Sequence, residues 1–213
     1  MQISVFDLDH TLLKVNSSYQ FGLYLYRNKI LSAASLLLCL SHYACHKWFG
    51  LSLEKLHGHV FNAFFRGRSL CEIQQWAHDF IQRELDLLIY APAIQRLHLA
   101  RQQGDYTVIL SSSPDFLVGP IAHHFEVSDW RATQYTEDSE GKLASLSHIV
   151  EGKDKARYVK ALANRLGIAL SSVTVYSDSY LDLPVLEIAG KAVGVSPDKS
   201  LKKVCQANEW EIL

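Results

Sequence analysis

The sequence predicts an α/β protein built on a doubly wound, Rossmann-like parallel sheet, and two observations support this fold class. Four short runs are uncharged, mainly apolar and rich in β-branched residues, which is typical of parallel strands buried on both faces. Helical patterns alternate with the later runs, as expected for βαβ units. The four predicted strands cover residues 3–6, 106–110, 173–176 and 192–195.

The helical patterns between these strands carry ordinary start and stop signals. Gly104, Gly167 and Gly190 follow three of them, and glycine just past the last turn is a common helix end. The segment TEDSEGK, between RATQY and LASLSHIV, breaks the pattern and predicts a β-hairpin over residues 131–150 near the sheet edge. The predicted helices cover residues 92–103, 114–124, 154–166 and 183–189.

Residues 16–89 have a different pattern, because aromatic and leucine-rich helical stretches follow one another with no convincing strand. This predicts three or four helices inserted after the first strand, forming a helical cap over the sheet. The expected domains are therefore an α/β core of residues 1–15 and 90–213 and a cap of residues 16–89.

The composition limits the partners and the class of protein. With 48% hydrophobic and 20% charged residues, the 213-residue chain is globular and long enough for a sizeable core. The 21 Lys and Arg against 22 Asp and Glu leave no bulk positive field, so we expect no nucleic-acid partner. No C-x-x-C spacing occurs, which indicates reduced, buried thiols at Cys39, Cys45, Cys71 and Cys205.

The first residues lead directly into a strand pattern, without the basic and apolar regions of a signal peptide, so we expect a cytoplasmic protein. The apolar run at residues 30–45 is shorter than the roughly 20 residues that cross a bilayer, and it contains His42 and several serines. A buried or interfacial helix is the expectation here. Contact of this helix with a membrane surface remains an alternative.

Polar and acidic residues follow three of the predicted strands. Asp7 and Asp9 stand two residues apart after the first, so in extended chain they point to the same side. Two such close carboxylates are costly to ionise unless a cation lies between them or they divide the roles of acid and nucleophile. A turn or helix cap is the ordinary alternative for this pair.

The other two strands end in similar groups. Ser111 and Ser112 precede a Pro-initiated helical pattern, where they serve either as caps or as part of a phosphate site. Asp178 and Asp182 follow the third strand and supply the oxygen ligands that suit Mg²⁺. Because α/β folds bind ligands at the carboxyl ends of their strands, the coincidence favours catalysis over three unrelated caps.

Taken together, these residues resemble the four motifs of the haloacid dehalogenase superfamily, in its phosphoserine-phosphatase-like branch, subfamily IB. The resemblance spans nearly the whole expected core, and it implies that the inserted helices form a C1-type cap. The matching segments are Asp7-x-Asp9-x-Thr11, Ser111, Gly152-x-x-Lys155 and Ser177-Asp178-Ser179-x-x-Asp182.

The resemblance implies a role for each matched residue. Asp7 would be the nucleophile and Asp9 the general acid and base, while Ser111 and Lys155 would hold the transferring phosphoryl oxygens. The spacing Gly-x-x-Lys favours Lys155 over Lys153 for this role. The implied cofactor is Mg²⁺, held by Asp7, the backbone carbonyl of Asp9 and Asp178, with Asp182 orienting either the metal shell or Lys155.

One position departs from the resemblance. In phosphoserine phosphatases an acidic residue nine positions after the nucleophile binds the ammonium group of the substrate, and this chain has Asn16 there. Asn16 and Ser112 are still candidate substrate contacts. A neutral amide at this position predicts weak activity on phosphoserine.

The expected function is that of a Mg²⁺-dependent phosphatase that hydrolyses a small phosphomonoester through an aspartyl-phosphate intermediate. A phosphotransferase would use the same residues, and a membrane-peripheral lipid-phosphate phosphatase would use residues 30–45 in addition. A signalling module that only accepts phosphate is a further alternative, but it would not need the acid and base at Asp9.

Overall fold

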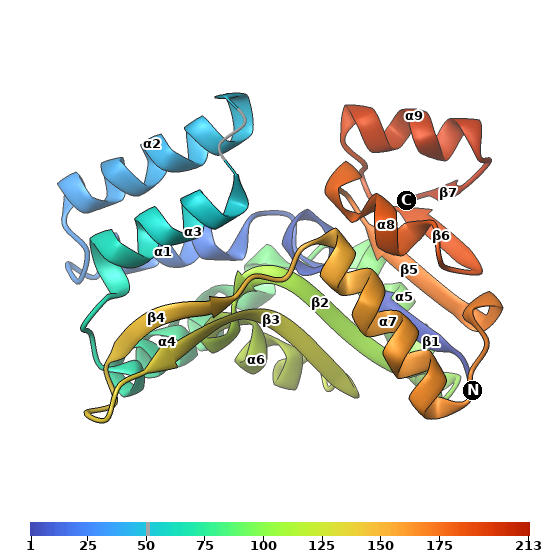
Figure 1. The fold of residues 1–213 in the computed structure, drawn as a ribbon, viewed down its shortest axis with the longest axis horizontal. Helices are drawn as coiled ribbons and strands as arrows, with labels where there is room; N and C mark the ends of the chain where they lie inside the picture. The colour runs from blue at the N-terminus through green and yellow to red at the C-terminus, as the bar shows by residue number, and fades with distance from the viewer. Residues whose placement is uncertain (50–51) are drawn as a thin grey trace.

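A seven-stranded sheet in the order β4-β3-β2-β1-β5-β6-β7 forms the centre of the structure, a computed structural model that describes residues 1–49 and 52–213 (Figure 1). All neighbouring strands are parallel except β3 and β4, which are antiparallel at one edge. The strands are β1 (Ile3–Phe6), β2 (Tyr106–Pro114), β3 (Asp129–Glu137), β4 (Leu143–His148), β5 (Val173–Ser177), β6 (Lys191–Gly194) and β7 (Glu211–Ile212).

Helices cover both faces of this sheet, because the strands are apolar on both sides. On one face, alternate residues such as Phe6 and Ile109 pack with α5 (Ala91–Gln102) and α6 (Asp115–His124). On the other, Val5 and Val108 pack with α7 (Gly152–Leu166), α8 (Leu183–Leu186) and α9 (Lys199–Ala207). This arrangement confirms the predicted doubly wound α/β fold.

The segment between β1 and α5 is helical. It begins with a turn at Leu8–Leu12 and continues through α1 (Ser17–Arg27), α2 (Ala33–Phe49), α3 (Leu53–Val60), a turn at Phe61–Phe65 and α4 (Leu70–Leu88). Here α4 packs against α6 and α1, and α2 packs against α3 (Figure 1). We propose that these helices are the cap of residues 16–89, and we call α1, α2 and α3 the inserted helices.

Several details differ from the sequence-based expectations. The helix expected over 183–189 ends at Leu186, and β7 was not predicted because two residues are too short for a pattern. The expectation of buried thiols is wrong for Cys45 and Cys71, which are exposed, since helical apolar runs carry side chains outward as well as inward. Within residues 1–49 and 52–213, no helix is sufficiently long and apolar to cross a bilayer.

Candidate active site

Three chain segments meet at the carboxyl edge of the sheet. Asp7 directly follows β1, and its backbone N–H donates to the carbonyl of Tyr176 on the neighbouring strand β5 at 2.9 Å. The ammonium of Lys155, in the first turn of α7, donates to Asp7 Oδ1 at 2.6 Å and to Asp182 Oδ2 at 2.7 Å. The first, third and fourth sequence motifs are therefore joined through one lysine.

Lys155 is held as a buried cation. Its side chain is 5% exposed. Burial opposes its charge, but the carboxylates of Asp182 and Asp7 outweigh this effect and raise its pKa above the ordinary lysine value. Asp182 also accepts from Ser177 Oγ at 2.7 Å. Of the two roles considered for Asp182, its contacts favour orienting Lys155.

Asp7 and Asp178 lie in a strongly negative environment. Burial is the main cause that raises the pKa of Asp7 to about 7, opposed by Lys155 and assisted by the charge on Asp182. Burial, followed by the charges on Asp7 and Asp182, raises the pKa of Asp178 to about 8. These three carboxylates face one ammonium, so two negative charges remain uncompensated when all are ionised.

This charge imbalance fits a divalent cation. Mg²⁺ takes oxygen ligands, usually one or two carboxylates together with water and phosphate oxygens, and Asp7 and Asp178 supply such a pair. The part of the chain that the structure describes has no group of three or more His, Cys, Asp or Glu side chains with metal-site geometry. A site closed by protein ligands alone is therefore not formed by these residues, whereas a Mg²⁺ site completed by water and phosphate is compatible with them.

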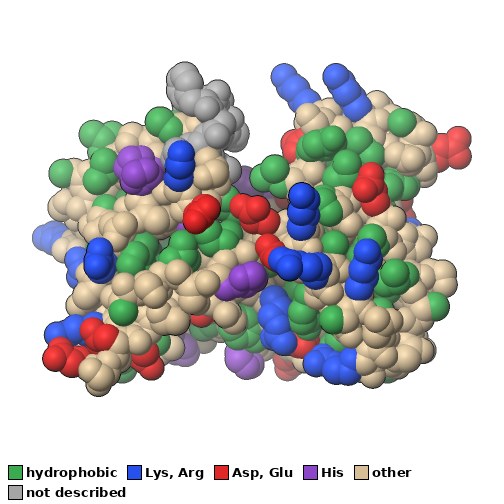
Figure 2. All heavy atoms as spheres, in the orientation of Figure 1, with side chains coloured by type: hydrophobic (Ala, Val, Ile, Leu, Met, Phe, Trp, Pro, Cys, Tyr) green, Lys and Arg blue, Asp and Glu red, His purple; other side chains and the backbone are tan. Residues whose placement is uncertain are grey.

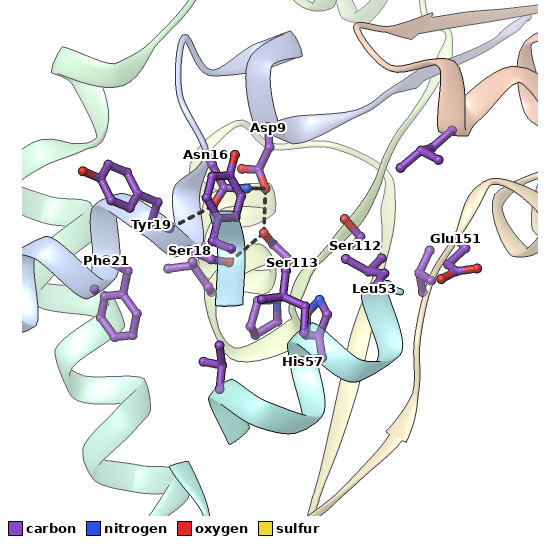
Figure 3. Close-up of a pocket in the computed structure, with 18 of the residues that line it drawn as sticks. Asp9, Asn16, Ser18, Tyr19, Phe21, Leu53, His57, Ser112, Ser113 and Glu151 are labelled. Carbon is purple, nitrogen blue, oxygen red and sulfur yellow. Dashed lines mark hydrogen bonds between the residues drawn. The ribbon is translucent and has the colours of Figure 1, made fainter. Parts of the chain in front are cut away.

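The carboxylate of Asp9 is turned into a hydrogen-bond network at the start of α1 (Figure 3). Its Oδ1 accepts from the backbone N–H of Ser17 at 2.7 Å, and its Oδ2 accepts from Ser113 Oγ at 2.6 Å and from Asn16 Nδ2 at 3.1 Å. Ser18 Oγ lies 2.8 Å from Ser113 Oγ. Asp9 thus links the turn after β1 to both α1 and the end of β2.

The contacts of Asn16 join two structural roles. Its Oδ1 accepts from the backbone N–H of Tyr19 at 2.8 Å and caps α1, while its Nδ2 donates to Asp9 (Figure 3). Asn16 also lines the cavity described below, so a substrate contact remains a prediction. Its hydrogen bonds make it first a positioning residue for Asp9.

The two candidate serines at the end of β2 are placed differently. Ser111 is fully buried, and its Oγ accepts from the backbone N–H of Ser113 at 3.1 Å. Ser112 lines the cavity and is among the lining residues labelled in Figure 3. Ser112 is therefore the more accessible of the two for a substrate oxygen.

Sequence reasoning missed Ser17 and Ser113 as partners of Asp9, and Ser18 as a partner of Ser113. Ser113 follows the predicted strand over residues 106–110 and directly precedes Pro114, but the pattern does not say which carboxylate it contacts. The serines of α1 are 95 and 96 residues away from it in the chain. Only the folded chain brings them together.

A cavity of about 1060 Å³ opens above these residues. Its floor contains Asp7, Asp9, Lys155 and Asp178, and its walls come from the inserted helices and from α6. Figure 2 shows the surface hollowed between the part formed by α2 and α3 and the part formed by α8 and α9. The acidic cluster and its lysine are therefore accessible to a molecule bound in this cavity.

Gly152 allows α7 to approach close enough to deliver Lys155. A Cβ at this position would lie 2.0 Å from the carbonyl oxygen of Leu181. We expect Gly152→Ala to lower the free energy of unfolding by about 3 kcal/mol or more, since backbone must move to relieve the overlap. Thermal or urea unfolding measures this. Gly58→Ala is the control, because a Cβ there meets nothing within 4 Å, and equal stabilities for the two variants would contradict the prediction.

The chain is similar to several known proteins. Residues 4–187 match the family described as haloacid dehalogenase-like hydrolase. A probable phosphatase of Mycobacterium tuberculosis is 27% identical over 98% of this chain and 73% of its own length. A phosphoserine phosphatase of the same organism is 28% identical over 97% of this chain and 68% of its own.

The fold is also found among solved structures. A Bordetella pertussis protein of unknown function superposes with a TM-score of 0.87 at 23% identity, covering 99% of this chain and 97% of the other. At this identity the likeness concerns the fold alone.

Proposed function

The chain belongs to the haloacid dehalogenase-like hydrolase family, and from this premise we propose that it is a Mg²⁺-dependent phosphatase that hydrolyses a phosphomonoester through an aspartyl-phosphate on Asp7. The observation that carries the proposal is the contact of Lys155 with both Asp7 and Asp182 at the floor of an open cavity. The relatives named as phosphatases support it.

Asp7 performs the first step. Its free carboxylate oxygen attacks phosphorus, and the bond from phosphorus to the leaving oxygen breaks, which leaves the phosphoryl group on Asp7. Lys155 holds Asp7 Oδ1 in place and supplies positive charge beside the transferring oxygens, with Ser112 as a further donor in the cavity lining. Mg²⁺ bound at Asp7, the Asp9 carbonyl and Asp178 would screen the nucleophile from the phosphate and polarise the phosphoryl oxygens.

Asp9 acts as the general acid and then as the general base. In the acid form it gives a proton to the leaving alkoxide, and as the carboxylate it then takes one from the water that hydrolyses the aspartyl-phosphate. Its bonds to Ser17, Ser113 and Asn16 fix the carboxyl group near the site. Asp9 is the reason to prefer a turnover enzyme over a module that only accepts phosphate.

Transfer of the phosphoryl group to an acceptor other than water would use the same residues. Phosphate release in the absence of any added acceptor separates the two reactions. The cytoplasmic location expected from the sequence stays a prediction.

The metal dependence is the direct test of the acidic pair. We expect EDTA to lower phosphate release from p-nitrophenyl phosphate by at least about 100-fold and Mg²⁺ to restore it, while Ca²⁺ supports it poorly because its looser shell misplaces the nucleophile. Asp178→Asn should raise the Mg²⁺ concentration needed for half the maximal rate. Full activity in chelator, or a strict need for zinc, would contradict the proposed site.

A further inference from the structure

The cavity has a charged floor and an uncharged wall. Its Asp, Glu and Lys residues lie at positions 7–9 and 151–198, at the edge of the sheet. In the described parts of residues 16–89, no lining side chain is a carboxylate, an ammonium or a guanidinium. The wall carries instead Phe21, Leu36, Leu40, Leu56 and Phe64, with Phe116 from α6.

The wall also carries polar side chains, and several of them are bonded within the protein. His57 Nδ1 lies 2.8 Å from the hydroxyl of Tyr135, so both side chains have a partner. Asn16 and Ser18 are bonded within the Asp9 network. These side chains are therefore bonded within the protein, and Tyr19 and Tyr43 line the same wall, while most of its remaining surface is hydrocarbon.

The cavity is also large. Its volume of about 1060 Å³ lies just above the range of about 300 to 1000 Å³ that is usual for drug-sized ligands. A three-carbon amino acid would fill little of it, and the described residues of 16–89 in its lining offer no charged carboxylate, ammonium or guanidinium to pair with the amino acid's own charges. Unpaired charges in such surroundings are strongly disfavoured.

We propose that the leaving group of the substrate is a hydrocarbon alcohol, an alkyl or isoprenoid chain of roughly eight or more carbons, seated between the inserted helices and α6. This inference rests on the proposed phosphatase function and adds its substrate class. The phosphate lies on Lys155 and Ser112 at the floor, and the chain extends along Phe21, Leu36 and Leu56. Affinity for the chain comes from the apolar area removed from water.

A homologous series tests this directly. We measure kcat/KM with Mg²⁺ for n-alkyl phosphates from ethyl to decyl, at concentrations where each is monomeric, together with phosphoserine and phosphoethanolamine. We expect a rise of about two- to fourfold per methylene, which corresponds to at most about 0.8 kcal/mol each. A flat series, or phosphoserine as the preferred substrate, would overturn the proposal.

Binding separates this inference from the proposed function. If none of these esters releases phosphate, the phosphatase proposal fails. Calorimetric titration with decylphosphonate and ethylphosphonate still tests whether the cavity wall binds an alkyl chain. We expect the decyl compound to bind at least 100-fold more tightly. Equal affinities would overturn the inference whatever the activity. A further arm presents decyl phosphate in phosphatidylcholine vesicles, and a higher rate there than in free solution identifies a membrane as the source of the chain.

A matched pair of glycine variants tests whether the alkyl chain of the substrate lies in the cavity. Gly22 in α1 lines the cavity, and a Cβ there would meet only Leu36 Cδ1, at 3.8 Å, so Gly22→Leu can fill the space while removing a helix-interior glycine. We expect it to lower kcat/KM for decyl phosphate at least tenfold and to leave ethyl phosphate within twofold. Gly58→Leu, in α3 and away from the cavity lining, should leave kcat/KM unchanged for both decyl and ethyl phosphate.

The melting temperature shows whether each glycine variant is folded. Gly22→Met, with a more flexible side chain, replaces Gly22→Leu if the leucine variant melts early. An equal loss for decyl and ethyl phosphate in a folded Gly22 variant would contradict a chain site at this wall.

Discussion

Replacing Asp7 by asparagine is expected to lower phosphate release by roughly 10⁴- to 10⁶-fold, the usual scale for removing a covalent nucleophile. The amide is nearly the same size as the carboxylate, and its oxygen can still accept from Lys155, so the local packing is retained. What is lost is the nucleophilic oxygen. The measurement is phosphate release from p-nitrophenyl phosphate with saturating Mg²⁺.

The Asp7 variant should be no less stable than the parent protein without metal. Burial already disfavours the charge on Asp7, as its raised pKa indicates, so the neutral amide removes a cost. Asp105→Asn is the control, because Asp105 contacts Gln2 and Ser4 at the opposite end of the sheet, and we expect its rate to stay near that of the parent. Ordinary turnover by Asp7→Asn, or a phosphoryl group trapped on another residue, would exclude the covalent mechanism.

Much of the sheet could be predicted from the sequence because its strands are buried on both faces. Runs such as residues 3–6 and 173–176 contain no charged residue and only Ser4 and Thr174 as small polar residues, and each pairs in parallel with its neighbours. The strand β7 at the edge of the sheet was harder to predict. β7 pairs through two residues only, and such a short segment has no periodicity to detect.

The burial of individual residues in the inserted helices could not be predicted from the sequence pattern. The apolar run of α2 predicts a helix, but not which side is buried, because nearly every side is apolar. Leu37 and Leu38 are exposed, while Leu36 and Leu40 line the cavity. Which residues meet a substrate depends on packing against α1 and α3, and that packing is a property of the folded chain.

The acidic cluster was predictable for a topological reason. Asp7, Asp178 and Asp182 follow two neighbouring parallel strands, and the carboxyl ends of such strands lie at the same edge of the sheet. This holds for any conformation of the connecting loops. The environment of Asp9 was not predictable, because its partners come from the start of α1 and the end of β2. Asn16 illustrates the difference: the sequence indicates a missing charge, whereas the folded chain adds its hydrogen bonds to Asp9 and Tyr19.

Lys155→Met is expected to damage both stability and activity, since this residue is the buried cation between two carboxylates. Removing one partner of a buried ion pair typically costs about 3–5 kcal/mol of unfolding free energy, and here Asp7 and Asp182 both lose their ammonium. Loss of positive charge beside the phosphoryl oxygens should also lower kcat by about 10²- to 10³-fold. Urea unfolding at pH 7 in EDTA and phosphate release with Mg²⁺ measure the two effects.

The pH dependence of this variant identifies the cause of its instability. Asp7 and Asp178 have raised pKa values in the folded protein, about 7 and about 8, so their ionisation opposes folding as the pH rises from about 4 through that range. Without Lys155 the opposition grows, and the metal-free variant should regain stability relative to the parent when the pH falls from 8 to 5. Lys153→Met, which changes an exposed residue two positions earlier in α7, should lose far less stability and show no such recovery. Equal losses in the two lysine variants, or a Lys155→Met deficit independent of pH, would mean that the lysine does not neutralise these carboxylates.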